Sequence, residues 1–190
     1  MLREIRLHGR GGQGAVTAAE LIAKAAFYEG KWSQAFPFFG AERRGAPVRA
    51  FARIDDKPIR LRSQIYRPDY VIVLDPFFIE EESLLRQVLS GLKEDGMIIA
   101  NAKSVRDDAP LLKYRLAIVD ATEIALQIGL IIAGIPVVNT AMVGAFAKAT
   151  GEVKLESVMK AVENTWSGKP AELNKKAVER AFHETRILKT

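Results

Sequence analysis

The sequence predicts an α/β fold: a doubly wound, mostly parallel sheet with a glycine-rich first βα turn and an inserted β-hairpin. The chain opens with an alternating run at residues 5–7, a glycine-rich turn at 9–14 and an unbroken run of helix formers at 15–29. In the second half, short apolar runs alternate with amphipathic helical stretches. We therefore expect residues 1–190 to form a single domain, with C-terminal helices over 153–186 packed on it.

The remaining elements follow from the two periodicities of helices and strands. Strands are expected over residues 31–36, 48–54, 58–65, 70–74, 97–100 and 115–119. Helices are expected over residues 80–92, 139–150, 153–166 and 171–186, and another begins at Glu123 with Thr122 as its N-cap. Residues 48–54 and 58–65 alternate in the strand manner across a three-residue connection, so we expect these two strands to pair as the hairpin.

The glycine-rich turn predicts an anion-binding loop. Its glycines have the spacing G-x-G-x-x-G between a strand and a helix. Gly9 is expected to leave the strand with φ and ψ values closed to other residues, Gly11 to let the backbone approach a bulky anion, and Gly14 to bring the helix close to the strand. The free N–H groups of the first helical turn and the helix dipole then favour a phosphate. The alternative, in which the glycines only serve a tight βα turn, stays open at this point.

Two details bear on the ligand that such a loop would take. A dinucleotide-binding unit carries an acidic residue at the end of its second strand, where it holds the ribose hydroxyls. The second strand here offers Ser33 and Gln34 instead, which counts against NAD. The loop also contains Arg10, which suits a ligand more highly charged than a pyrophosphate.

Composition excludes several classes of protein. The 190 residues include 48% hydrophobic and 27% charged side chains, which is typical of a globular protein. The absence of cysteine excludes disulfides, thiolate metal sites, iron–sulfur ligation and cysteine nucleophiles. With only His8 and His183, we expect no metal site. Charge from Arg3 onward argues against a signal peptide, and the longest apolar run, 128–138, is too short to span a bilayer, so we expect a cytoplasmic protein.

Positive charge is concentrated in one stretch of a chain whose net charge is +5. The stretch lies between residues 42 and 67 and contains Arg43, Arg44, Arg49, Arg53, Arg60, Arg62 and Arg67. Such a cluster suits a compact polyanion or an acidic partner subunit better than a long duplex, so we expect no nucleic-acid partner and no membrane. Nearby, Phe38 and Phe39 cannot both point inward from an extended segment. We therefore expect this loop to be buried against another chain.

The sequence holds a binding loop without an evident catalytic set. Asp75 and Asp120 each end a predicted strand at the carboxyl edge of the sheet, where ligands bind. Nothing marks either one as a general base, so capping a helix or orienting a loop is the favoured role. His8 is interpreted first as a core histidine and second as a ligand contact. No G-x-S-x-G elbow is present.

Two segments together resemble a known family. Residues 8–14, HGRGGQG, and 39–51, FGAERRGAPVRAF, closely resemble the gamma subunit of the 2-oxoacid:ferredoxin oxidoreductases, which include the pyruvate and 2-oxoisovalerate enzymes. Residues 139–145, NTAMVGA, are similar to a later segment of the family, in which leucine is more usual at the position of Val143. The likeness covers residues 1 to about 185.

The resemblance implies a division of labour among subunits. Thiamine diphosphate, Mg²⁺ and iron–sulfur clusters would lie on the alpha, beta and delta partner subunits, and the complex would pass electrons to ferredoxin. This chain would help to bind coenzyme A and would hold no catalytic residue of its own. The expected coenzyme A contacts are Gly9, Arg10, Gly11, Gly12, Gln13, Gly14, Arg43 and Arg44. Alternatively, Arg43 and Glu42 could form ion pairs across a subunit interface.

Two other interpretations stay open. One is a free-standing NAD-binding, Rossmann-like oxidoreductase, which the missing acidic residue and missing catalytic set disfavour. The other is the equivalent subunit of an indolepyruvate-type enzyme, which shares the same glycine turn. The identity of the 2-oxoacid is not encoded in this chain, because its pocket would lie on other subunits.

Overall fold

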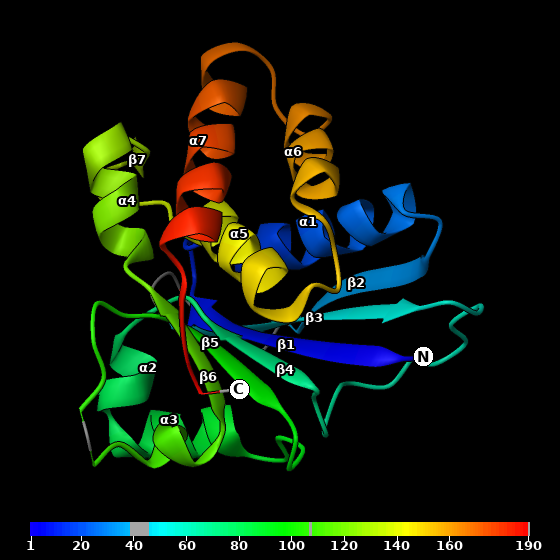
Figure 1. Cartoon of the computed structure of the whole chain (residues 1–190), viewed down its shortest axis with the longest axis vertical. Coiled ribbons are helices and arrows are strands. Elements are labelled where there is room, and N and C mark those ends of the chain that lie inside the picture. Colours follow the sequence, from blue (N-terminus) through cyan, green and yellow to red (C-terminus); the bar gives the residue numbers. More distant parts are fainter. Residues whose placement is uncertain (39–45, 107, 190) are drawn as a thin grey trace.

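A central β-sheet organises the molecule (Figure 1). Within residues 1–38, 46–106 and 108–189, which the computed structural model describes, this sheet has seven strands in the order β2-β3-β1-β4-β5-β6-β9. Its parallel centre consists of β1 (Arg3–Arg10), β4 (Tyr70–Val73), β5 (Met97–Asn101) and β6 (Arg115–Val119). Antiparallel strands flank this centre, namely β2 (Trp32–Phe38) and β3 (Pro47–Asp55) on one side and β9 (Arg186–Lys189) on the other.

Helices cover both faces of the sheet (Figure 1). One face carries α1 (Ala15–Tyr28), α4 (Ala121–Ile128), α5 (Asn139–Thr150), α6 (Leu155–Glu163) and α7 (Gly168–Glu184). The other carries α2 (Phe77–Glu80), α3 (Glu82–Leu89) and a 3-10 helix (Pro110–Lys113). Each face buries its own apolar cluster, because the central strands present apolar side chains alternately to the two sides.

These features confirm the predicted fold class, a mostly parallel α/β sheet with a glycine-rich first βα turn. The agreement is closest where the apolar pattern is strongest. The strand expected at 115–119 is β6 and the helix expected at 139–150 is α5, with the same bounds in both cases.

The inserted hairpin has a different partner from the one expected. β3 pairs with β2 on one edge and with β1 on the other, so the hairpin is β2–β3, and the fully described stretch 58–65 forms no strand. Both edges of β3 are occupied, which leaves no ladder for a further strand. Side chains hold the displaced segment instead: Arg53 Nη2 donates to the carbonyl of Ser63 at 2.8 Å, and Gln34 Nε2 donates to that of Ile59 at 3.0 Å.

Several other boundaries differ from expectation. The helix predicted over 80–92 is two short helices, and the side chain of Glu81 caps the second by accepting from the backbone N–H groups of Ser83 and Leu84. Lys169 and Pro170 lie inside the first turn of α7 and do not separate it from α6. Two further elements were not expected from the sequence, namely β9 and a small hairpin of β7 (Ile131–Ile132) with β8 (Ile135–Pro136).

Candidate functional site

The glycine-rich turn lies at the switch point of the sheet. It follows β1, whose crossover helix α1 covers one face, and it adjoins the end of β4, whose helix α2 covers the other. At such a point the connections from two neighbouring parallel strands diverge and leave a crevice at their carboxyl ends, where α/β proteins bind ligands. The position of the turn therefore agrees with a binding role.

The backbone of the turn departs from the expected use of its glycines. The backbone of Gly9 does not adopt the left-handed region, because β1 continues through this residue and pairs it with Val48. Gly12 and Gly14 adopt the left-handed region, with φ of 98° and 80°. At Gly14 a Cβ would also overlap the side chain of Asn139, so this glycine allows α5, not the strand, to approach closely.

Asp75 fixes the shape of the turn. Its Oδ2 accepts from Arg10 Nε at 2.9 Å and from Gln13 Nε2 at 3.1 Å, while its Oδ1 accepts from the backbone N–H of Phe77 at 3.0 Å. Gln13 completes the brace, since its Oε1 accepts from the N–H of Arg10 at 2.6 Å. The expectation that Asp75 orients a loop is thus confirmed, and Gln13 serves the loop's geometry.

A cavity of about 940 Å³ opens beside the turn. Its polar end is formed by the turn and the first residues of α1, including the amides of Ala15, Val16 and Thr17, which have no partner inside the helix. Asn139 at the start of α5 and Pro170 at the start of α7 also line it, so three helix N-termini converge there. Their dipoles favour a negatively charged group.

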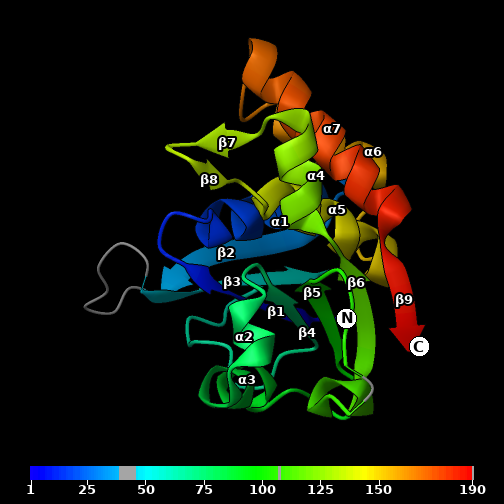
Figure 2. The ribbon, with the colours of Figure 1, turned by 90° about the vertical axis from the view of Figure 1, so that its left-hand side faces the viewer.

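The rest of the cavity wall is apolar. The β7–β8 hairpin stands beside the N-terminal end of α1 and forms one side (Figure 2). The apolar lining comprises Val48, Leu130, Ile131, Ile132, Ile135, Val137, Trp166 and Leu173. A ligand that suits this cavity has an anionic part and a long apolar or aromatic part.

The predicted site residues divide into three groups. Arg10, Gly11, Gly12 and Gly14 line the cavity, whereas Gly9 and Gln13 support the turn from behind. Arg43 and Arg44, together with Phe39 and Glu42, lie outside the described residues. Among the contributors to the cavity that were not predicted are Asn139, Trp166 and the β7–β8 hairpin. Of these, only Asn139 carried a signal, because it opens the NTAMVGA segment.

A second cavity, of about 840 Å³, lies at the carboxyl ends of β4, β5 and β6. Asn101 organises its floor by donating from Nδ2 to the carbonyl of Leu74 at 2.8 Å and to Thr122 Oγ1 at 2.9 Å. Asp120 accepts from the N–H of Glu123 at 2.9 Å and is the N-cap of α4. The prediction that Thr122 is the N-cap is wrong, because α4 begins at Ala121 and Thr122 lies within its first turn.

His8 is a core residue, as the favoured interpretation held. Its side chain is buried and its Nε2 accepts from Arg6 Nε at 3.0 Å, which requires the neutral imidazole. Burial, with Arg6 and Arg49 nearby, holds the pKa of His8 well below its usual value. Arg6 also donates to the carbonyls of Val88 and Ser90 at the end of α3, where a cation complements the helix dipole.

Neither a cluster of metal ligands nor a membrane-crossing helix occurs in the described part of the chain. No three His, Cys, Asp or Glu side chains in residues 1–38, 46–106 and 108–189 come together as metal ligands. None of the helices in that part combines the length and the apolar character needed to cross a bilayer.

Fold and cavity together define an α/β domain of the Rossmann-like kind, with a glycine loop and converging helix N-termini at the switch point. A family model described as pyruvate ferredoxin/flavodoxin oxidoreductase matches residues 4–184. The chain belongs to this family, and its resemblance to the gamma subunit is confirmed.

Three relatives illustrate the likeness. The pyruvate/ketoisovalerate oxidoreductases common subunit gamma of Pyrococcus abyssi is 56% identical over 188 residues, 97% of each chain. Pyruvate oxidoreductase subunit PORC from Thermotoga maritima superposes with a TM-score of 0.83 at 35% identity, over 99% of each chain. The 2-oxoglutarate:ferredoxin oxidoreductase from Magnetococcus marinus, solved with 2-oxoglutarate, coenzyme A and succinyl-CoA bound, has a TM-score of 0.72 at 14% identity. The likeness covers 95% of this chain and 30% of that one and concerns the fold.

Proposed function

We propose that this chain is the non-redox subunit of a cytoplasmic 2-oxoacid:ferredoxin oxidoreductase and that it helps to bind coenzyme A. The complex would convert pyruvate or another 2-oxoacid to acyl-CoA and CO₂ and reduce ferredoxin. Alpha, beta and delta subunits would hold thiamine diphosphate, Mg²⁺ and the iron–sulfur clusters, which supply the decarboxylation and electron transfer. The names of the relatives support this assignment, since they describe subunits of pyruvate and ketoisovalerate oxidoreductases.

The cavity beside the glycine loop is the observation that carries the coenzyme A proposal. Coenzyme A joins a phosphorylated nucleotide to a long pantetheine arm, and the cavity joins three helix N-termini to an apolar wall that includes Trp166. The first-turn amides of α1 would face the phosphates, with Arg10 beside them. The Magnetococcus marinus enzyme, whose solved structure has coenzyme A bound and whose fold includes a counterpart of this chain, gives further support.

Asp75 has a part in this proposal although it carries the wrong charge for a phosphate. It holds the guanidinium of Arg10 at 2.9 Å and the amide of Gln13 at 3.1 Å, so the loop is set before a ligand arrives. A loop ordered in advance loses less entropy on binding. Arg43 and Arg44 would add positive charge to the same ligand.

The test is Arg10→Ala in the assembled complex, with Arg86→Ala as the matched control. Removing one charge-assisted contact costs roughly 1.5–3 kcal/mol, so the Michaelis constant for coenzyme A should rise about ten- to hundredfold. The constant for the 2-oxoacid should stay the same, because that molecule binds elsewhere. Arg86 is exposed on α3 and contacts Glu82, so its removal should change neither constant.

Thermal stability separates a binding role from a structural one. An unchanged coenzyme A constant in Arg10→Ala would remove the arginine from the proposal. If both constants rose together while the melting temperature fell, Arg10 would act by holding the loop through Asp75 and not by contacting the ligand. In that case Arg10→Lys, which keeps the charge near Asp75, should restore part of the stability.

A further inference from the structure

We propose that residues 57–67 dock against an acidic surface of another subunit of the complex. This inference rests on the proposed function in that it assumes a multi-subunit assembly, but it concerns a different part of the molecule. The segment connects β3 to β4 at the amino end of the parallel strands, whereas the glycine loop lies at their carboxyl end. Its four cationic side chains, called here the basic strip, are Lys57, Arg60, Arg62 and Arg67.

No described residue forms a direct ion pair with the basic strip, although Asp56 lies next to Lys57 in the sequence. The four side chains of the strip are exposed and form no ion pair or hydrogen bond with any residue that the structure describes. The acidic residues at the two ends of the segment are already engaged. Asp55 and Asp56 bind the N-terminal ammonium of Met1, and Asp69 binds Arg3 and Lys93. Four cations in eleven residues create a local positive potential that an acidic surface would match.

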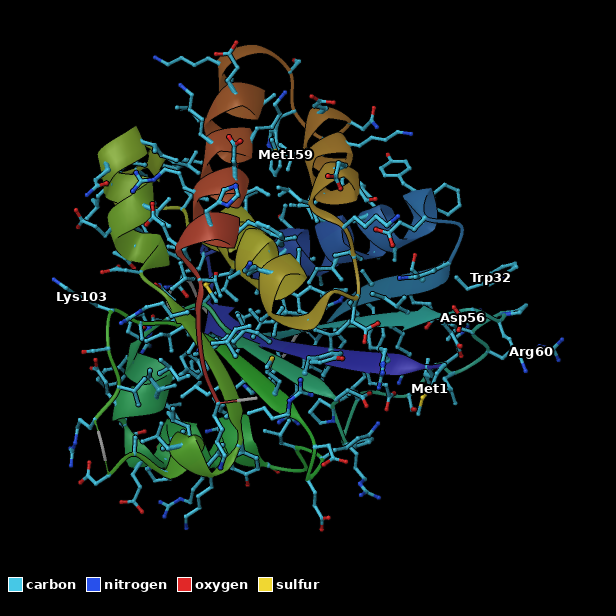
Figure 3. The ribbon with its side chains drawn as sticks, viewed as in Figure 1. Met1, Trp32, Asp56, Arg60, Lys103 and Met159 are labelled. Atoms are coloured by element: carbon cyan, nitrogen blue, oxygen red, sulfur yellow. The ribbon has the colours of Figure 1, made fainter. Side chains whose placement is uncertain are left out.

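Apolar side chains accompany the charges. Tyr66 is 69% exposed and Leu61 is 47% exposed, so both present much of an apolar side chain to water next to the strip. Trp32, 54% exposed, pairs with Asp55 across β2 and β3, and Figure 3 shows it at the same end of the sheet as Met1, Asp56 and Arg60. Aromatic residues and arginine are the types enriched at the centres of protein interfaces. This mixture favours a protein partner over a nucleic acid, whose backbone would use the charges alone.

The segment is held in a defined shape although it forms no ladder. Arg53 is 1% exposed, pairs with Glu4 at 2.9 Å and donates to the carbonyl of Ser63. Ile65 is buried, and Gly91 approaches the carbonyl of Tyr66 so closely that a Cβ there would overlap it. The buried Arg53 thus holds residues 57–67 in place, while the cations of this segment face solvent. Such ordering lowers the entropic cost of docking.

The test compares two triple charge reversals in the full complex. The strip variant carries Arg60→Glu, Arg62→Glu and Arg67→Glu. The control variant reverses three exposed cations on or beside α6 and α7, with the same total change of charge: Lys154→Glu, Lys169→Glu and Lys176→Glu. Each chain is co-expressed with its partner subunits, and the complex is assayed by gel filtration and by affinity at two salt concentrations. The strip variant should associate on the order of tenfold more weakly or worse, and the lysine variant like the wild type.

Association of the wild type should weaken with added salt, and that salt dependence should be smaller in the neutral variant Arg60→Gln, Arg62→Gln, Arg67→Gln. The melting temperature of each isolated chain should be unchanged, because the three arginines have no partner among the described residues. Assembly of the strip variant at wild-type affinity would overturn the docking proposal. The proposal would also be overturned if the strip variant assembled normally and the isolated wild-type chain, but not the variant, bound duplex DNA.

In either case, an altered Michaelis constant for coenzyme A in Arg10→Ala would still uphold the proposed function. A wild-type chain that joined no complex would overturn both.

Discussion

At the scale of single residues, buried and half-buried charges in this protein position the backbone. Arg6 closes the end of α3, Arg53 holds the segment before β4, and Asp75 braces the glycine loop. Each group contacts more than one partner, which offsets much of the cost of removing a charge from water, although Nη1 of Arg53 is buried without a hydrogen-bond partner. His8 belongs to the same pattern, because it accepts from Arg6 while packing edge-on against Phe78 at 5.9 Å between ring centroids.

The buried His8 should make stability depend on pH. Its pKa in the folded chain lies well below the ordinary value of 6.5, so below pH 6.5 the unfolded chain takes up a proton that the folded chain does not. The contribution of His8 is therefore fully present above pH 6.5 and is lost as the pH falls, at up to about 1.4 kcal/mol per pH unit.

Urea unfolding of wild type and His8→Gln at pH 8, 6.5 and 5.5 measures this contribution. The glutamine variant should be less stable at pH 8, since it loses packing, but its stability should fall less steeply toward acid. Parallel slopes for the two chains would show that His8 keeps the same pKa in both states.

At the scale of elements, the contact between α5 and α7 depends on one glycine. Gly144 is buried in α5, and a Cβ there would overlap the backbone carbonyl of Val178 in α7. Helix propensity alone predicts that Gly144→Ala stabilises the chain by about 1 kcal/mol. The backbone clash predicts a loss of about 1–3 kcal/mol, because α7 must move away from α5.

We expect the clash to dominate in Gly144→Ala. Chemical denaturation should show a net destabilisation, while Glu179→Ala, at an exposed position next to Val178 in α7, should change stability by less than about 0.5 kcal/mol. Because α7 and Asn139 both line the cavity, the glycine variant should also weaken coenzyme A binding in the complex if the cavity is the proposed coenzyme A site. A stabilised Gly144→Ala would show that the two helices part at little cost.

The elements with a local pattern could be predicted from the sequence, and those defined by distant partners could not. The buried strands β4, β5 and β6 follow from their apolar runs, and α5 from its small residues. The wrong hairpin partner arose because local alternation does not reveal which strand edge is free. The sequence of β9, RILK, places two apolar residues side by side and does not alternate, and all four residues are exposed, so no strand periodicity marked it. Strands of two residues, as in β7 and β8, are too short for any periodicity.

In the candidate site, too, the contiguous part could be predicted from the sequence and the part formed by distant residues could not. The glycine loop is contiguous and was predicted, although Gly9 and Gly14 serve other purposes than expected. Asn139 and Trp166 reach the cavity from more than a hundred residues away, through the packing that Gly14 and Gly144 allow. That packing is a tertiary property, which a single sequence does not display.

At the scale of the whole molecule, the two ends of the parallel strands differ in character. The carboxyl end holds both cavities and the glycine loop, and the amino end holds the basic strip with its exposed aromatic neighbours. This separation allows one end to contact a ligand while the other contacts a protein. It also means that substitutions at one end should leave the function of the other unchanged, since they share no partners among the described residues.

The isolated chain should bind neither thiamine diphosphate nor an iron–sulfur cluster and should oxidise no 2-oxoacid. It has no cysteine, and its described residues bring together no group of metal ligands. Ferredoxin-dependent oxidation of pyruvate and of a branched 2-oxoacid, assayed under anaerobic conditions, should appear only when the partner subunits are added. If Arg10 contacts coenzyme A as proposed, the Arg10→Ala chain should restore activity at saturating coenzyme A and fail at low coenzyme A, because the variant can still assemble. Turnover by the purified single chain would contradict the division of labour, because the chemistry would then need a centre that these residues do not supply.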